Sequence, residues 1–479
     1  MRLRNARLGG AFADVTLDGE RIASVAPAGT TTVDGETVDL DGRWLLPGLW
    51  DSHVHLTQWA LTRQRVDLSS ATSAAEAAAL VRAAATQRAE RADTDVLVGR
   101  GFRDGLWPDT PTRELLDEAA PGLLVVLVSA DIHACWLSSA ALERFGHPGS
   151  TGLLREDDCF AVVRDLDRAG EHLHDDWVRE AAEAAARRGV VGITDLEMTW
   201  NRDVWLRRMS AGFDALRVRF GIYPQHLDRA LGEGMRTGQR LAPLLEVGPF
   251  KIITDGSLNT RTAFCADPYP GVHDHPYGLL TVPPDDLAEW LRRAAGGGLV
   301  PAVHAIGDEA NRFALDAFER VGVGGRIEHA QLLHERDFAR FATLGVEASV
   351  QPEHAMDDRD VAERYWADRT ARSFALRTLL DAGARLRLGS DAPVAPLDPW
   401  ITIAAAVGRA RDGREPWHPE QAITPGEALT ASTDSGIAAG APADLVVVDR
   451  DPLQAEPERL RSMPVAATVV QGRFTHTSL

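Results

Sequence analysis

Lysine is almost absent from this chain of 479 residues: Lys251 is the sole lysine among 51 lysine and arginine residues. Aspartate and glutamate together number 70, which gives a formal net charge of −19 at pH 7. Such a surface repels polyanions unless basic residues gather locally, and no basic run is visible in the sequence. The charge balance therefore argues against nucleic acids and anionic membranes as partners.

Long apolar runs and paired cysteines are missing as well. No stretch approaches the roughly 20 apolar residues that span a membrane, and the N-terminal residues contain no apolar core of a secretion signal. Cys135, Cys159 and Cys265 lack the CxxC spacing, which is typical of buried thiols in a reducing compartment. We therefore expect a cytoplasmic protein without a disulfide framework, and a homodimer is compatible with the sequence.

Both ends of the chain alternate apolar and polar residues in short runs that Gly, Asp and Pro interrupt. "ADVTLDG" and "RIASVAP" near the N-terminus, like "ADLVVVDRDP" and "AATVVQGRF" near the C-terminus, are typical of short strands. We predict that residues 1–48 and 436–479 together form one small β-sandwich domain.

Between the ends, short β-branched runs stop abruptly at polar residues and alternate with helical patterns. The runs are "LLPGLWDSHVHL", "VVGITDLEM", "LRVRFGIYPQ", "PFKIITDGS", "GLVPAVHAIGD", "GRIEHAQLL", "GVEASVQPEH" and "ARLRLGSDAP". One intervening helical pattern places Leu287, Trp290, Leu291 and Ala294 on the same face. The alternation predicts an α/β fold, a (β/α)8 TIM-like barrel over residues 49–435, with its active site at the C-terminal ends of the strands.

Residues 57–175 separate the first two predicted strands by far more than a crossover helix needs. Within this segment, Ser73 and Glu76 have the spacing of a capping box at the start of a helix. We expect an inserted subdomain that covers the mouth of the active site. A separate N-terminal domain would need a linker rich in Pro, Gly or Ser, and none is visible.

Several predicted strand ends carry side chains that bind metal ions. These residues are His53, His55, Lys251, His304, His329 and Asp391. Neutral imidazole and carboxylate suit a borderline divalent ion such as zinc. One catalytic zinc takes about three protein ligands and keeps an open position. The larger set therefore predicts either two ions or a base held beside one ion.

The sole lysine can do chemistry that arginine cannot. A buried amine near a metal loses its proton and reacts with CO2 to give a carbamate, an anionic oxygen ligand able to bridge two ions, whereas a guanidinium keeps its proton. Because Lys251 falls at a predicted strand end, we predict a carboxylated lysine. A lysine retained for an ion pair is the alternative.

The motifs resemble the amidohydrolase superfamily, specifically its amidohydrolase-3 (YtcJ-like) branch. The segments that carry the resemblance are "LPGLWDSHVHL", "KIITDGSLNTRTA", "HAIGDEA", "RIEHAQLL", "LGSDAPVAPLDPW" and "ADLVVVDRDP". The resemblance implies a metal-dependent hydrolase whose ligands are the four strand-end histidines, Lys251 as the carboxylated bridge between two zinc ions, and Asp391 as both ligand and general acid/base. It also matches Asp131–Trp136 to a branch motif, which would bring His133 from the insertion into the pocket.

This ligand set predicts an amidohydrolase acting on carbon–nitrogen bonds other than peptide bonds. The ions would lower the pKa of a bridging water toward about 7. Asp391 would take the proton as the metal-activated hydroxide attacks an amide carbonyl, and would then pass it to the departing nitrogen. We expect a small N-acyl, N-formyl or cyclic amide. The alternatives are an esterase, lactonase or phosphoesterase on the same site, or a non-catalytic metal-binding paralogue.

Residues that contact the substrate are harder to predict than the ligands. Arg261, just beyond the fourth strand, is a candidate for holding a substrate carboxylate, with a surface ion pair as the alternative. Glu197, after the second strand, either forms a polar pocket wall or pairs with a buried arginine. His133 either reaches the substrate or caps its own helix. His354 follows the seventh strand and is expected near the mouth.

Overall fold

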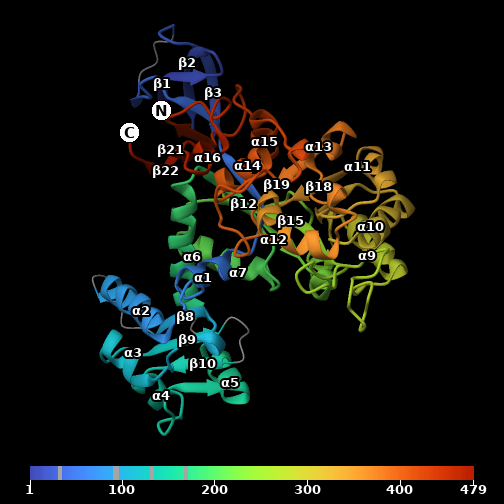
Figure 1. Ribbon diagram of the computed structural model, residues 1–479. Helices are drawn as coiled ribbons and strands as arrows, with labels where there is room; N and C mark the ends of the chain where they lie inside the picture. The colour runs from blue at the N-terminus through green and yellow to red at the C-terminus, as the bar shows by residue number, and fades with distance from the viewer. Residues whose placement is uncertain (31–34, 90–95, 130–133, 167–170) are drawn as a thin grey trace. The chain divides into compact units, whose positions relative to one another are not determined.

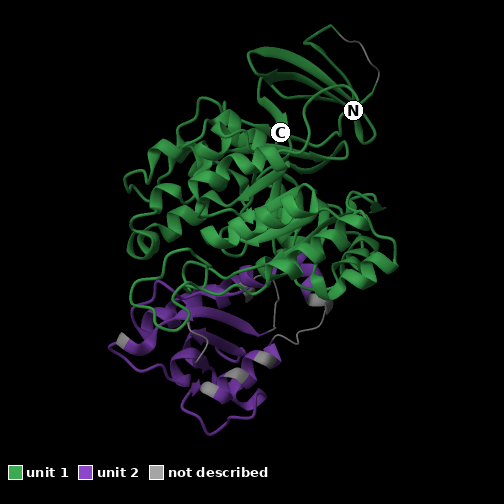
Figure 2. Ribbon diagram, turned by 90° about the vertical axis from the view of Figure 1, so that its right-hand side faces the viewer, with its two compact units in different colours: residues 1–59, 179–479 green, residues 60–178 purple. Residues whose placement is uncertain are grey.

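The structure is a computed structural model that describes residues 1–30, 35–89, 96–129, 134–166 and 171–479 (Figure 1). The chain forms two compact units, Met1–Trp59 with Arg179–Leu479, and Ala60–Val178 (Figure 2). The second unit leaves the first after its first barrel strand and returns before its second. A separate compact unit is therefore inserted after the first barrel strand, and the range of 57–175 stays a prediction.

Parallel strands form the centre of the first unit. Along the sheet they are β6 (Leu49–Val54), β12 (Val190–Asp195), β13 (Arg217–Ile222), β15 (Leu245–Ile253), β16 (Pro301–Ala305), β17 (Gly325–His329), β18 (Val346–Val350) and β19 (Leu386–Leu388), with β14 (Arg240–Ala242) antiparallel to β15. Every position of β6 and β12 is buried, as expected for strands covered on both faces. All eight predicted strands are confirmed.

The sheet closes into a barrel where β19 meets β6. Val54 forms a parallel bridge with Ala392, and the N–H of Asp391 donates to the carbonyl oxygen of His53 at 2.8 Å. The predicted (β/α)8 barrel is thus confirmed, and the closure places residues from its first and last strands beside one another.

Helices follow the barrel strands and pack outside them (Figure 1). They are α7 (Asn201–Ser210), α8 (Leu227–Gly232), α9 (Pro284–Gly296), α10 (Asp308–Val321), α11 (Phe338–Leu344), α12 (Pro352–Tyr365), α13 (Leu376–Asp381), α14 (Pro399–Gly408) and α15 (Pro425–Ala431). A further helix nearer the C-terminus, α16 (Pro457–Arg461), packs against α14. The predicted apolar face of α9 is buried through Leu287, Leu291 and Ala294. α10 ends at Gly322, whose φ of 73° suits a residue without a Cβ.

The two chain ends pair in one separate sheet of the first unit. Its strands are β1 (Arg2–Leu8), β2 (Ala11–Asp18), β3 (Arg21–Pro27), β4 (Thr37–Asp39), β5 (Trp44–Pro47), β20 (Leu445–Val448), β21 (Val465–Val470) and β22 (Arg473–Thr477). β5 pairs antiparallel with β20, which joins the N-terminal strands to the C-terminal ones. Apolar side chains from both ends, such as Leu3, Val15 and Val469, share one core.

The second unit has its own sheet and core. The sheet contains β7 (Val66–Asp67), β8 (Leu97–Phe102), β9 (Val125–Ser129), β10 (Ala134–Leu137) and β11 (Leu153–Arg155), and its helices are α2 (Ala74–Ala89), α3 (Arg113–Ala119), α4 (Ser139–Arg144) and α5 (Glu156–Leu166). The chain passes between the units within α1 (Leu56–Arg63) and α6 (Glu171–Ala186). Ser73 Oγ accepts from the Glu76 N–H as predicted, but the Glu76 carboxylate accepts from the Thr72 N–H instead of closing a capping box on Ser73.

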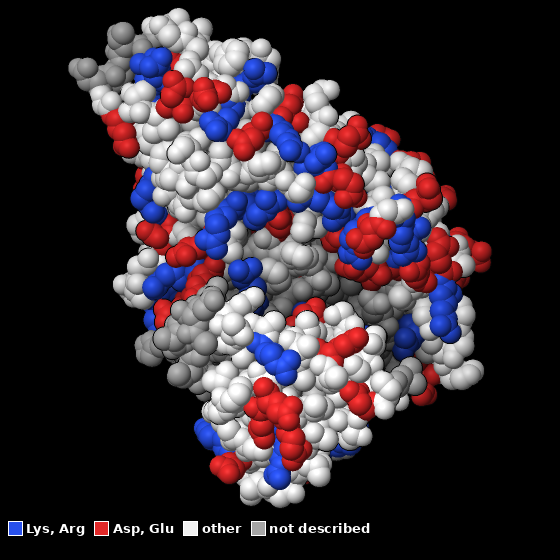
Figure 3. Space-filling model, turned by 60° about the vertical axis from the view of Figure 1, so that its left-hand side comes forward, with Lys and Arg blue, Asp and Glu red and all other residues white. Residues whose placement is uncertain are grey.

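Arginine fills the ordinary structural roles of a cation in this chain. Figure 3 shows one face of the surface, on which acidic and basic side chains lie close to one another. Arg340, for example, contacts Asp316, Glu319 and Asp337. In the described part of the chain, no helix is both long and apolar enough to cross a membrane. The cytoplasmic location stays a prediction.

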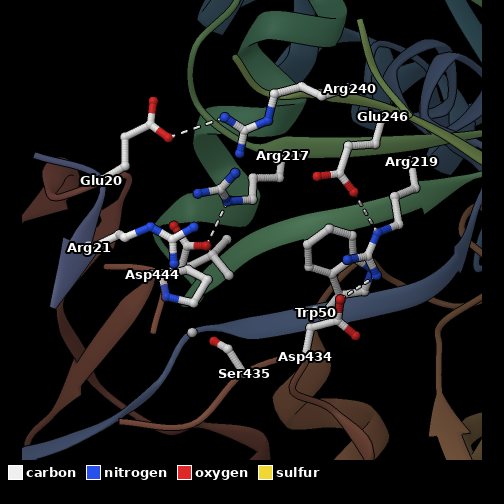
Figure 4. Close-up of a pocket in the computed structure, with 13 residues that line it drawn as sticks. Glu20, Arg21, Trp50, Arg217, Arg219, Arg240, Glu246, Asp434, Ser435 and Asp444 are labelled. Carbon is white, nitrogen blue, oxygen red and sulfur yellow. Dashed lines mark hydrogen bonds and ion pairs between the residues drawn. The ribbon is translucent and has the colours of Figure 1, made fainter. Parts of the chain in front are cut away.

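Arginine–carboxylate pairs also line a crevice at the N-terminal ends of the first barrel strands. Arg217 on β13 pairs with Asp444 at 2.6 Å, and Arg240 pairs with Glu20 at 3.4 Å (Figure 4). Arg219 contacts Glu246 at 3.3 Å and Asp434, and its guanidinium lies 4.2 Å from the Trp50 ring centroid. The Arg217–Asp444 and Arg240–Glu20 pairs join the barrel sheet to the sheet of the chain ends, whereas Arg219 and Glu246 join two barrel strands.

Candidate metal centre

The candidate ligands of the first and last barrel strands converge on one carboxylate. His53 lies in β6 and His55 follows it, so the strand alternation turns both imidazoles to the same side. The Nε2 atoms of His53 and His55 each lie 3.4 Å from Oδ1 of Asp391. The barrel closure brings Asp391 to this position.

Two further histidines complete the cluster. The ring centroid of His329 lies 5.1 Å from that of His53 and 4.5 Å from that of His304, which is on the neighbouring strand β16. His53, His329 and Asp391 offer one ligand atom each within 4.8 Å of one another. Three donors so close together suit a single divalent ion. His55 lies beside His53, and His304 lies beside His329.

Local strain and missing hydrogen bonds support a ligand role for these residues. His329 has a φ of 73° and Asp391 a φ of 56°, a conformation that costs a non-glycine residue roughly 1–3 kcal/mol and occurs most at functional sites. Nδ1 of His55 and Nδ1 of His329 are buried and have no hydrogen-bond partner among the described residues. Buried polar atoms rarely lack a hydrogen-bond partner. The set of histidine nitrogens with a carboxylate fits a metal ion.

The sole lysine lies beneath the cluster on β15. Lys251 is 2% exposed, and its Nζ has no hydrogen-bond partner within the described ranges. Burial lowers the pKa of Lys251 to about 8, although Glu328 and Asp391 oppose the shift. At neutral pH a fraction of this amine is therefore uncharged, as reaction with CO2 requires.

Glu328, which the sequence prediction omitted, orients a candidate ligand. Its Oε2 lies 2.8 Å from Nδ1 of His53, and its other carboxylate oxygen lies 2.5 Å from Nε of Arg326. A carboxylate on Nδ1 fixes the tautomer and leaves Nε2 free for a metal. Adjacent strand residues normally point to opposite faces, but the positive φ of His329 ends this alternation, so Glu328 and His329 both reach the centre.

Asp51 holds the two sides of the barrel closure together. Its carboxylate accepts from the N–H of His53 at 3.1 Å and from the N–H of Ser390 at 3.0 Å. Burial raises the pKa of Asp51 to about 7. This residue fixes the backbone on which His53 and Asp391 are mounted.

The candidate ligands line a cavity of about 660 Å³ within the barrel unit. They are His53, His55, Lys251, His304, His329 and Asp391. Other lining residues are polar, such as Gln58, Asn259 and His354, or apolar, such as Ile253 and Leu258. The volume is that of a pocket for a small molecule. His354 is thus at the cavity, as expected from its position after β18.

Neither Arg261 nor Glu197 is among the described residues that line this cavity. Arg261 is exposed, and its Nη1 donates to the carbonyl oxygen of Asn259 at 3.2 Å. Glu197 is buried, but it accepts from the backbone and side-chain amides of Gln58 at 2.8 and 3.1 Å, so its partner is not an arginine. His133 lies outside the described residues.

Comparison with known proteins bears on the identity of this centre. The sequence profile of the Amidohydrolase family matches residues 36–476. The chain is 28% identical over 488 residues to the putative amidohydrolase YtcJ of Bacillus subtilis, covering 92% of this chain and 90% of that one. It is 27% identical over 528 residues to the N-substituted formamide deformylase of Arthrobacter pascens, covering 96% and 94%.

A solved structure extends the likeness to the fold. An uncharacterized metal-dependent hydrolase from Pyrococcus furiosus is similar to the chain with a TM-score of 0.77 at 25% identity, covering 95% of this chain and 99% of that one. The resemblance inferred from the six motifs is confirmed.

Proposed function

Because this chain belongs to the amidohydrolase family, we propose that it is a metal-dependent enzyme that hydrolyses the carbon–nitrogen bond of a small N-acyl, N-formyl or cyclic amide. The observation that carries the proposal is the convergence of His53, His329 and Asp391 within 4.8 Å at the C-terminal end of the barrel. Likeness to a formamide deformylase over 96% of this chain supports an amide in preference to an ester.

The residues that would hold the metal are Asp391 and the four strand-end histidines, His53, His55, His304 and His329. We propose two zinc ions bridged by carboxylated Lys251. Bound divalent ions supply Lewis acidity, which polarises a carbonyl and lowers the pKa of water. Burial lowers the pKa of His53 to about 4 and that of His329 well below its usual range. Both imidazoles are therefore neutral at pH 7, the state in which they bind metal.

Asp391 is the proposed general acid/base. Burial opposes its ionisation, but the imidazoles of His53, His55 and His329 hold the pKa of Asp391 well below its usual range. The carboxylate is therefore ionised and can accept a proton from the attacking water. It can then deliver that proton to the departing nitrogen, which an amide leaving group requires.

The test is a hydrolysis assay of zinc-loaded protein on N-formyl and N-acyl amines, run beside a panel of chromogenic esters. We expect turnover of amides. Asp391→Asn should reduce kcat by about 10²–10⁴-fold, the usual contribution of general acid–base catalysis, while zinc stays bound by the histidines. Unchanged kcat in this variant would remove Asp391 from the role, and turnover of esters alone would reassign the enzyme to ester hydrolysis.

A further inference from the structure

One face of helix α12 forms the wall of the cavity beyond the candidate ligands. His354, Asp357 and Asp358 all line the cavity. Residues three or four positions apart lie on the same side of a helix, with side chains about 5–6 Å apart. The cavity therefore extends from His354 along roughly one helical turn to Asp358.

Asp358 is a buried carboxylate that has no arginine or lysine partner among the described residues, although the His354 imidazole acts on it through its charge. It is 8% exposed and accepts from the side-chain amides of Asn259 at 2.6 Å and Gln331 at 3.3 Å. Neither amide carries a charge, and within the described ranges no lysine or arginine forms an ion pair with Asp358. Burial raises its pKa. A buried carboxylate of this kind is more stable when a cation joins it.

The adjacent carboxylate provides a contrast on the same helix. Asp357 has its own cation, because Nη2 of Arg411 lies 2.7 Å from its Oδ1. The side chain of Asp357 is also far more exposed, at 41%. Of the two carboxylates, Asp358 is the one without an arginine partner in the described part of the chain.

His354 gives a second, independent indication of a ligand. It is 8% exposed, and its Nε2 is buried with no hydrogen-bond partner in the described part of the chain. This atom lies 3.9 Å from Oδ2 of Asp391, between the candidate metal centre and the next turn of α12. An unpartnered buried nitrogen at a cavity wall indicates that a polar group of a ligand completes it.

The charges along the cavity favour one sign of ligand. Its charged residues are Lys251, Asp357, Asp358 and Asp391, and no arginine is among the described residues that line it. In a chain so rich in arginine, a pocket built for an anion would be expected to contain one. Arg261, the residue predicted to hold a substrate carboxylate, is not at the cavity.

We propose that the substrate is a mono-acylated or mono-formylated diamine, whose free ammonium group binds at Asp358 while the amide lies at the metal centre. This rests on the proposed function for the position of the amide. The distance between the amide and the ammonium follows from α12, because Asp358 lies about one helical turn beyond His354. The substrate therefore needs a spacer of several methylenes between the two groups. The apolar residues Ile253 and Leu258 give that spacer a surface to pack on.

The experiment compares three formamides of similar length that differ in terminal charge. They are the mono-formyl derivative of hexanediamine, N-heptylformamide, and the N-formyl derivative of aminohexanoate. We expect the cation to have the highest kcat/KM and the anion the lowest. Asp358→Asn should reduce kcat/KM for the cation by about 10–100-fold, chiefly through KM, and should reduce kcat/KM for the neutral amide far less.

The matched control is Asp360→Asn. Asp360 is also on α12, but it pairs with Arg414 at 2.7 Å and does not line the cavity. The Asp360→Asn variant removes the same charge from the same helix. We expect it to leave the order of kcat/KM among the three probes unchanged. Equal losses on all three probes in Asp358→Asn, or wild-type preference for the anion, would overturn the proposal.

Binding without turnover separates this proposal from the proposed function. If wild-type protein cleaves none of the three amides, amide hydrolysis fails, and calorimetry with heptylamine and heptanoate still tests the charge preference. Tighter binding of heptylamine supports the assignment, and equal or tighter binding of heptanoate contradicts it. If Asp358→Asn fails to fold, the binding of heptylamine and heptanoate to wild-type protein tests the charge preference by itself.

Discussion

The two ends of the barrel use polar side chains in opposite ways. At the N-terminal end of the strands, Arg217, Arg219 and Arg240 each contact a carboxylate (Figure 4). At the C-terminal end, Nζ of Lys251 and Nδ1 of His329 are buried and unpartnered among the described residues. The polar groups at the N-terminal end of the strands hold parts of the chain together. Those at the C-terminal end have ligand atoms free to bind a metal ion or a substrate.

This difference indicates how structural and functional polar groups are told apart. A paired charge at the junction has its hydrogen bonds supplied by the chain, so replacing it should change stability alone. A buried donor or acceptor without a partner costs free energy in the isolated chain, and a ligand recovers that cost. Metal and substrate should therefore act on one end of the barrel and leave the other unaffected.

Removal of the metal should have the largest effect. We expect a chelator to abolish turnover, and added zinc to restore it. Because the ion binds the folded chain only, its loss should also lower the melting temperature. Turnover and calorimetry on the same metal-free sample check both effects. Full activity in protein that contains no metal would contradict the proposed mechanism.

Glu328→Gln should have the next largest effect, because it weakens the hydrogen bond that orients the His53 imidazole. The loss of a carboxylate that orients a metal-binding histidine typically costs about 10–100-fold in metal affinity, which competition titration with a chelating dye measures. The control is Glu347→Gln on the neighbouring strand, where Glu347 pairs with Arg387 at 3.4 Å and does not line the cavity. Equal zinc affinity in both variants would show that Glu328 does not position the ligand.

Asp444→Asn should have a smaller effect, confined to stability. Asp444 accepts from Nε of Arg217 and from the N–H of Gln471, and it is 6% exposed. Leaving a half-buried guanidinium without its carboxylate costs about 1–3 kcal/mol, so calorimetry should record a lower melting temperature with kcat/KM unchanged. Asp285→Asn, which breaks an exposed pair with Arg320, should leave both unchanged. A loss of activity in Asp444→Asn would mean that the two ends are coupled.

The barrel and its candidate ligands were predictable because both follow from local patterns. Runs such as "GRIEHAQLL" end in polar residues, and parallel strands deliver their ends to one face, so His304 and His329 could be placed without a structure. Glu328 was not predictable, since its approach to His53 depends on the backbone turn at His329. The position of Asp358 in the cavity wall depends on how α12 packs beside the loop that carries Asn259. Short-range sequence patterns do not predict such packing.

Arg261 shows where position along the chain misleads. It follows β15 closely, as a residue at the cavity mouth would, but the loop turns it outward to within 5.7 Å of the Tyr365 ring centroid. Asn259 faces the cavity from the same loop instead. Distance from a strand end thus predicts which loop borders a site, and loop conformation decides which side chain enters it.

We propose that the unpartnered buried groups at the C-terminal end of the barrel strands are metal ligands, with Lys251 carboxylated to bridge two ions. The most direct test is the number of metal ions per chain, measured by mass spectrometry on protein purified without chelator, for wild type and Lys251→Arg. We expect about two ions per wild-type chain and one or none in the variant, because a guanidinium cannot form the carbamate. The same count in both proteins would contradict it.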